Sequence, residues 1–194
     1  MEPVRWGVLG CANIALRTVI PAMQQSALTP VVAIASRNGD KARAAAESLG
    51  IPRAHGSYEA LLADDGIDAI YNPLPNNLHL EWSVKALEAG KHVLCEKPLT
   101  MDAAEAEEMI RARDRTGLCA EEAMMARDHP QWIKVRELID GGEIGELRAM
   151  QLAFTYNNPN PANIRNKVET GGGGIYDLGV YTRTIARLAF DDEP

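Results

Sequence analysis

Short apolar runs alternate with longer helix-like segments from Val4 to Glu122, and this alternation constrains the fold more than any other feature of the chain. Short apolar runs are typical of buried strands, and longer amphipathic segments are typical of helices. Their alternation predicts βαβ units, a parallel sheet and right-handed crossovers. The expected strands are Val4–Leu9, Pro30–Ser36, Ile67–Tyr71, Lys91–Cys95 and Leu118–Glu122, and the expected helices are Asn13–Gln25, Asp40–Leu49, Leu78–Glu88 and Asp102–Arg115.

The carboxyl ends of parallel strands meet at one edge of the sheet, and ligands of such sheets bind there. Gly10, Ser36, Asn72 and Glu96 each lie at the end of one of the expected strands. We therefore expect these four residues at the ligand-binding edge.

The turn after the first strand has the position of a dinucleotide-binding fingerprint. Its sequence, GVLGCANIA, reads as G-x-A-x-x-A, in which Gly10 provides the tight turn and Ala12 and Ala15 are small enough for close backbone approach. N–H groups at the start of the next helix would then face a pyrophosphate. From this motif alone, a cofactor site and an ordinary tight turn are equally good explanations.

The end of the second strand bears on which dinucleotide binds. NAD-selective sites usually have Asp or Glu at this place, whereas this chain has Ser36-Arg37-Asn38. A hydroxyl and a guanidinium suit the additional phosphate of NADP. A solvated loop is the alternative, and the nearby Asp40 leaves NAD possible, so the pattern favours NADP without excluding NAD.

Two proline-containing loops follow the next two strands. In YNPLPNNLH, residues 71–79, the prolines stiffen the loop, and Asn76 and Asn77 can cap the helix that follows. In HVLCEKPLT, residues 92–100, Lys97 lies just beyond a strand end and precedes Pro98, where a cis bond is possible. Glu96 can orient the Lys97 ammonium for a role in catalysis, and a solvated loop lysine is the alternative.

Together, GCANIA, NPLPNNLH and CEKPL resemble the Gfo/Idh/MocA family of NAD(P)-dependent oxidoreductases. The similarity continues in EEAMMARDHPQ (121–131), in NIR (163–165) and in GGGGIYDLGVY (171–181), and so covers essentially the whole chain. It implies an α/β fold in which a Rossmann-type dinucleotide-binding domain, residues 1–123, is followed by the start of an α+β domain, residues 124–194. This second domain, for substrate binding or oligomerisation, would have an open, mostly antiparallel sheet.

The resemblance also implies a catalytic set of Lys97, Asp177 and Tyr181. Lys97 would contact the substrate hydroxyl that loses hydride, and Tyr181 would remove its proton while hydride moves to C4 of the nicotinamide. Asp177 and Tyr181 are four residues apart and would share a helix face. Tyr at this position, where many members have His, resembles the branch with aldose and dihydrodiol dehydrogenases.

The remaining candidate residues bind cofactor or substrate. Arg165 is expected to hold substrate oxygens with its five donors, although a surface arginine explains it nearly as well. Substrate-binding candidates are thus Lys97, Arg165, Asp177 and Tyr181. Cofactor-binding candidates are Gly10, Cys11, Ala12, Asn13, Ile14, Ser36, Arg37, Asn72, Pro73, Leu74, Asn77, His79, Glu96, Lys97 and Arg127. Arg127 departs from the family pattern, because Ala126 and Asp128 flank it where aromatic residues are common.

These features predict an NADP-dependent oxidoreductase acting on a small carbohydrate or polyol, with an aldose or related cyclic polyol as the expected substrate. A non-catalytic, nucleotide-sensing regulator on the same scaffold is the alternative. Such a regulator would have no need of the three catalytic candidates together, so the sequence favours the enzyme.

Composition excludes several other classes of function. A net charge of −7 argues against a nucleic-acid partner, and no apolar run is long enough to span a membrane. The N-terminus resembles no secretory signal. Cys11, Cys95 and Cys119 lack the spacing of a metal site and are typical of reduced thiols in a cytoplasmic protein.

The second domain is expected to begin with a long strand, Glu146–Tyr156, and to contain a helix, Gly174–Leu188. Members of the family are considerably longer, so most of the expected sheet is absent. Natural truncation, a sequence that ends early and a split protein completed by a partner are three open explanations. Apolar faces left without a sheet predict a homo-oligomer or a complementing chain that covers them.

Overall fold

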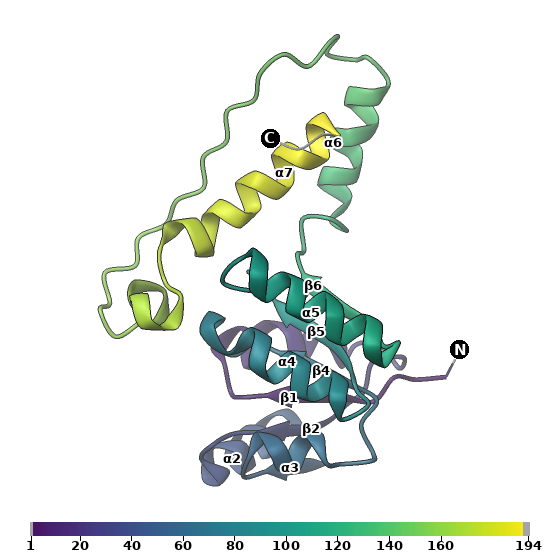
Figure 1. Ribbon diagram of the computed structural model, residues 1–194, viewed down its shortest axis with the longest axis vertical. Helices are drawn as coiled ribbons and strands as arrows, with labels where there is room; N and C mark the ends of the chain where they lie inside the picture. The colour runs from purple at the N-terminus through teal and green to yellow at the C-terminus, as the bar shows by residue number, and fades with distance from the viewer. Residues whose placement is uncertain (1, 192–194) are drawn as a thin grey trace. The chain divides into compact units, whose positions relative to one another are not determined.

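The computed structural model describes residues 2–191 (Figure 1). The chain forms two compact units, Met1–Glu122 and Ala123–Pro194, which meet one residue before the boundary expected from the sequence. The first unit contains a six-stranded sheet in the order β3-β2-β1-β4-β5-β6. The pairs β1–β2, β2–β3, β1–β4 and β4–β5 are all parallel. The predicted α/β fold with a parallel sheet is thus confirmed.

The strands are β1 Trp6–Leu9, β2 Val31–Ala35, β3 Arg53–His55, β4 Ala69–Asn72, β5 His92–Glu96 and β6 Ala120–Ala123. The helices of this unit are α1 Ile20–Met23, α2 Gly39–Leu49, α3 Tyr58–Leu62, α4 His79–Glu88 and α5 Ala103–Thr116. A π-helical turn, η1 Ala15–Val19, leads into α1, and a 3₁₀ turn, η2 Asn76–Leu78, leads into α4. The sequence patterns did not predict β3 or α3.

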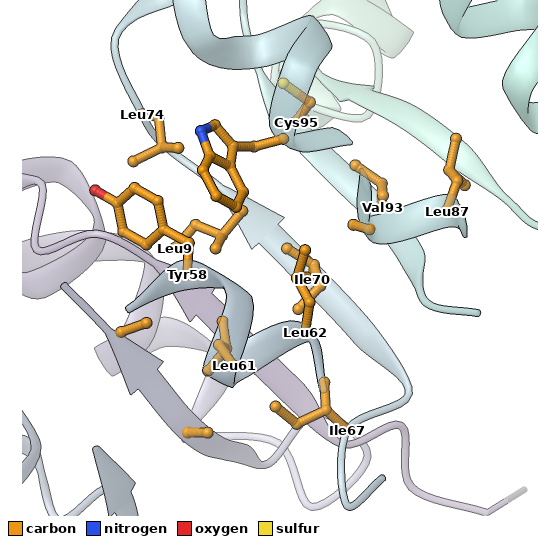
Figure 2. Packing of buried hydrophobic residues seen from close by; sticks show 14 of the residues in the cluster. Leu9, Tyr58, Leu61, Leu62, Ile67, Ile70, Leu74, Leu87, Val93 and Cys95 are labelled. Carbon is orange, nitrogen blue, oxygen red and sulfur yellow. The ribbon is translucent and has the colours of Figure 1, made fainter. Parts of the chain in front are cut away.

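Successive residues of the central strands pack into different layers of helices, as the two-residue period of a strand requires. Leu9 and Ile70 belong to a core with α3, α4 and α5, whereas Val8 and Tyr71 belong to a core with η1, α1 and α2. Figure 2 shows the first of these cores, with Leu9 beside Tyr58 of α3. Burial on both faces explains why these strands are nearly continuous apolar runs.

Side chains cap the starts of α2 and α5. Asn38 caps α2 by accepting a hydrogen bond from the Lys41 N–H (3.1 Å), and Asp102 caps α5 through the Glu105 N–H (2.9 Å). The expected asparagine cap of α4 is wrong. Asn76 and Asn77 lie inside η2, and the N-cap residue of α4 makes no side-chain capping bond.

The regular secondary structure of the second unit, in its described residues, is helical. It contains α6 Pro130–Asp140 and α7 Val180–Phe190, two 3₁₀ turns, η3 Ile164–Asn166 and η4 Val168–Thr170, and a π-helical turn, η5 Ile175–Gly179, before α7. The helix predicted for Gly174–Leu188 is confirmed by η5 and α7. The sequence patterns did not predict α6, although Pro130 stands at its first turn and His129 caps it.

The strand expected at Glu146–Tyr156 is wrong. These residues have no regular secondary structure, and no strand occurs in residues 124–191. A strand completes its backbone hydrogen bonds on a neighbouring strand, and no such neighbour forms in residues 124–191.

Candidate functional site

Gly10 forms a tight turn at the carboxyl end of β1. Its φ of +78° lies in the left-handed region, and its N–H donates to the Ala35 carbonyl at 2.8 Å. A Cβ at this position would lie 2.9 Å from Leu74 Cδ2. Both the backbone conformation and the lack of space therefore require glycine. Helical structure begins three residues later, at Asn13, so a helix start lies directly after the turn.

Ser36 and Arg37 follow β2 beside this turn. Ser36 is buried, and its hydroxyl accepts a hydrogen bond from the Asn38 N–H (3.2 Å), whereas Arg37 is exposed. Burial raises the pKa of Tyr58, and the Arg37 guanidinium beside it opposes that rise. The Tyr58 hydroxyl also lies 3.5 Å from the place of a Cβ on Gly10. Tyr58 therefore belongs to the candidate site, and the sequence patterns missed it because they missed α3.

Cys11, the residue after Gly10, is half-buried, and its Sγ lies 3.9 Å from the Lys41 carbonyl oxygen. Burial raises the pKa of this thiol. Ala12 is half-buried, whereas Asn13 and Ile14 are exposed at the helix start. This segment is where the sequence predicted a pyrophosphate.

Asn72 holds the loop after β4 from within. It is fully buried, and its Nδ2 donates to the His79 carbonyl (3.2 Å) and to the Ser83 hydroxyl (3.0 Å). Its Oδ1 accepts from the Leu74 N–H (3.3 Å). Pro73 and Leu74 are buried as well, and Asn77 is the exposed member of this set.

His79, another cofactor-binding candidate, is fully buried at the start of α4. Its Nδ1 lies 2.7 Å from the Pro98 carbonyl oxygen, and its Nε2 lies 2.8 Å from the Leu74 carbonyl oxygen. Burial lowers the pKa of His79, although the two carbonyls and the carboxylates of Glu96 and Glu122 oppose this shift. The ring thus presents no surface to a cofactor and contacts two loops instead.

Lys97 is half-buried just beyond the carboxyl end of β5. The Glu96 carboxylate beside it accepts hydrogen bonds from the Tyr71 hydroxyl (2.7 Å) and from the Lys97 backbone N–H (3.3 Å). The Lys97–Pro98 peptide bond is cis. β1 pairs in parallel with β2 and β4, and β4 pairs in parallel with β5. Gly10, Ser36, Asn72 and Glu96 therefore lie at one edge of the sheet, as the sequence indicated.

Asp177 is the centre of a cluster in the second unit. One of its carboxylate oxygens accepts from Arg165 Nε at 3.0 Å, and the other accepts from the Tyr156 hydroxyl. The Asp177 side chain is 12% exposed, whereas that of Arg165 is 44% exposed. Burial and the Asp177 carboxylate raise the pKa of Tyr156. Sequence reasoning missed Tyr156, because it placed this residue at the end of the expected strand.

Tyr181 lies four residues after Asp177 and lines an open cavity of ≈ 340 Å³ within the second unit. Its ring meets that of Phe154 edge to face, with centroids 5.4 Å apart. Trp132 adds a third aromatic side chain to a mostly apolar lining. Arg127, also in this unit, is exposed.

Within residues 2–191, no group of three or more His, Cys, Asp or Glu side chains is arranged to hold a metal ion. No helix of that range is both long enough and apolar enough to cross a bilayer. Cys11, Cys95 and Cys119 are free thiols.

The first unit has the strand order of a Rossmann fold, a glycine turn after β1 and polar residues along the carboxyl edge of the sheet. These features define a Rossmann-type nucleotide-binding protein. Residues 4–123 match the model of the GFO/IDH/MocA oxidoreductase family with its NAD-binding Rossmann fold. Residues 132–194 match the GFO/IDH/MocA C-terminal domain. The chain belongs to this family.

Relatives in sequence include an uncharacterized oxidoreductase of Rhizobium meliloti, which is 52% identical over 100% of this chain and 58% of its own length. The dTDP-3,4-didehydro-2,6-dideoxy-alpha-D-glucose 3-reductase of Actinomadura kijaniata is 45% identical over 96% of this chain and 56% of its own. A D-xylose 1-dehydrogenase (NADP(+)) of Haloferax volcanii is 44% identical over 94% and 56%. This chain therefore spans little more than half the length of these relatives.

Solved structures show the same fold. The 3-ketoreductase from Actinomadura kijaniata, in complex with NADP and TDP-benzene, superposes with a TM-score of 0.92 at 43% identity. The match covers 97% of this chain and 58% of that one. The aldose-aldose oxidoreductase from Caulobacter crescentus, complexed with glycerol, gives a TM-score of 0.86 at 26% identity, over 100% and 59%.

Proposed function

We propose that this chain forms the cofactor-binding part, and part of the substrate-binding domain, of an NADP-dependent oxidoreductase. The enzyme would transfer hydride between a hydroxyl of a sugar or polyol and the nicotinamide. The observation that carries this proposal is the meeting of the Gly10 turn, Ser36-Arg37 and Lys97 at one edge of the sheet. The names of the relatives, a sugar 3-reductase and a xylose dehydrogenase, support the choice of substrate class.

The residues of this edge fit NADP. Glycine at position 10 allows the left-handed turn with Leu74 packed directly against it, as the tight turn of a dinucleotide fingerprint requires. The exposed Arg37 guanidinium and the Ser36 hydroxyl offer donors to the additional phosphate of NADP. When bound, the nicotinamide supplies the hydride acceptor or donor. Asn72 and its hydrogen bonds hold the Pro73–Leu74 segment beside the turn.

We assign separate roles to the catalytic candidates. Lys97 binds the reacting hydroxyl through its ammonium, and Tyr181 moves the hydroxyl proton. Asp177 accepts hydrogen bonds on both carboxylate oxygens, so it serves to orient Arg165 and Tyr156 rather than to transfer a proton. Arg165 keeps further N–H donors for substrate oxygens. A homo-oligomer or a complementing chain, as expected from the sequence, is part of this proposal.

A substrate panel tests this function. The protein is incubated with NADP and with D-xylose, D-glucose, a cyclic polyol or a non-carbohydrate alcohol, and NADPH formation is followed by absorbance. We expect turnover with at least one carbohydrate or polyol. Turnover only with non-carbohydrate alcohols would contradict the substrate class. Tight NADPH binding without any turnover would favour the regulatory alternative.

Changing Arg37 to aspartate should reverse the cofactor preference. The variant loses the charge-assisted hydrogen bonds to the additional phosphate and adds a repelling carboxylate, so NADP affinity should fall at least about tenfold. NAD affinity should stay level or rise. Isothermal titration of both cofactors measures the change.

Arg115→Asp is a matched control, because it makes the same charge change. Arg115 pairs with Glu88 at the end of α4, away from the carboxyl edge of the sheet, so this variant should bind NADP as the wild type does. Tighter binding of NAD than NADP by the wild type, or an Arg37→Asp variant with unchanged NADP affinity, would refute the assignment.

A further inference from the structure

His79 has an unusual set of hydrogen-bond partners. A buried neutral imidazole has one N–H donor and one nitrogen lone pair, so it is normally satisfied by one acceptor and one donor. Both ring nitrogens of His79 instead lie at hydrogen-bond distance from carbonyl oxygens, those of Pro98 (2.7 Å) and Leu74 (2.8 Å). A ring placed only to fill the core would not need two acceptors.

The two carbonyls belong to different loops at the carboxyl edge of the sheet. Leu74 lies in the loop after β4, and its Cδ2 lies 2.9 Å from the place of a Cβ on Gly10. Pro98 directly follows Lys97 in the loop after β5. The fully buried ring of His79 therefore contacts two loops. One loop packs on the Gly10 turn, and the other carries Lys97.

Charged groups from both neighbouring strands also act on this ring. Glu96 at the end of β5 and Glu122 in β6 favour a second ring proton, as do the two carbonyls, whereas burial disfavours it and has the larger effect. Burial therefore lowers the pKa of His79, and the ring lies at hydrogen-bond distance from both carbonyl oxygens.

We propose that His79 is a positioning residue that couples the loop after β4 to the loop after β5, so that Leu74 and Lys97 keep a fixed relation. Only the purpose of this coupling, which is to keep the Gly10 turn and Lys97 aligned for cofactor and substrate, rests on the proposed function. The coupling itself is a property of the first unit, and it can be measured without cofactor or substrate.

Amide hydrogen exchange in the cofactor-free protein tests the coupling. The Leu74 N–H bonds to Asn72 Oδ1, and the Leu99 N–H bonds to Glu122 Oε1 at 3.0 Å, so each amide reports on one of the two loops. In His79→Gln, both amides should exchange at least about tenfold faster, because the carboxamide cannot reach both carbonyls as the ring does. The Val8 amide, in the middle of β1, should keep its wild-type rate.

His92→Gln is the matched control, because His92 lies at the opposite, amino end of β5, where it accepts a hydrogen bond from the Cys119 N–H. It should leave Leu74 and Leu99 unchanged. In His79→Gln, faster exchange at only one loop amide, at neither, or equally at Val8 would overturn the proposal. The last result would show that the ring stabilises the fold as a whole.

The wild-type protein provides a second measurement if His79→Gln does not fold. Exchange in increasing, sub-denaturing concentrations of denaturant gives an opening free energy for each amide. Coupled loops should give one common value for Leu74 and Leu99, below that of Val8, and two distinct values would overturn the coupling. NADPH affinity is measured in parallel. A wild type that binds neither NADP nor NAD would contradict the proposed function and leave the coupling result intact.

Discussion

Replacing Lys97 with alanine is expected to lower kcat on the order of a hundredfold or more, while NADP affinity changes little. The ammonium is proposed to act on the reacting hydroxyl, so its loss removes an interaction that strengthens in the transition state. The phosphates are proposed to bind at the Gly10 turn, which Lys97 does not form. Steady-state kinetics and cofactor titration of one preparation separate the two effects. The kinetics are measured on the form of the protein that shows turnover, either this chain alone or this chain together with its complementing chain.

Two further variants sharpen this experiment. Lys97→Arg keeps the positive charge but changes its shape, so it should recover only part of the lost kcat. Lys85→Ala removes an exposed lysine of α4, which pairs with Glu81, and should keep wild-type kinetics. Near-normal kcat in Lys97→Ala would disprove the catalytic assignment. Loss of NADP binding in that variant would move the lysine to the cofactor site.

The central part of the fold could be predicted from the sequence, because strands buried on both faces read as apolar runs. The run Ile67–Tyr71 corresponds to β4, Ala69–Asn72, and the expected helix Asp102–Arg115 corresponds to α5, Ala103–Thr116. In contrast, β3 and α3 contain only three and five residues. Segments this short carry too little periodicity for recognition, and they form through contacts with β2 and the core.

The expected strand Glu146–Tyr156 was implied by the family resemblance, which describes a longer protein. The hydrogen bonds of a strand are made with another segment. No such segment forms in residues 124–191. A helix completes its bonds within itself, which explains why the expected helix Gly174–Leu188 formed and the expected strand did not.

The candidate site likewise contains some residues that the sequence could place and others that it could not. Gly10, Ser36, Asn72 and Glu96 could be placed together because each ends a parallel strand, and strand ends share an edge. Tyr58 lies beside the Gly10 turn, although the two are 48 residues apart in the chain. Tyr156 donates to Asp177, which is 21 residues away. Sequence periodicity has no signal for such contacts, so both tyrosines emerged only from the structure.

Changing Gly10 to alanine is expected to abolish most of the cofactor binding. A residue with a Cβ is strained at a φ of +78°, and this Cβ would lie 2.9 Å from Leu74 Cδ2, so the turn must change its backbone conformation. The N–H groups that face the pyrophosphate would then lose their alignment. Loss of one or more such charge-assisted bonds should lower NADP affinity at least about tenfold, as measured by isothermal titration.

Gly50→Ala separates this local effect from general destabilisation. Gly50 ends α2 with a φ of +65°, and nothing lies within 4 Å of the Cβ it would gain. Gly50→Ala should lose about 1 kcal/mol in the free energy of unfolding, because it forces an alanine into a conformation that favours glycine. Gly10→Ala should lose at least as much, because its Cβ also meets Leu74. Gly50 is remote from the carboxyl edge, so its variant should bind NADP as the wild type does. Equal NADP affinities in the two variants would show that the Gly10 turn does not hold the cofactor.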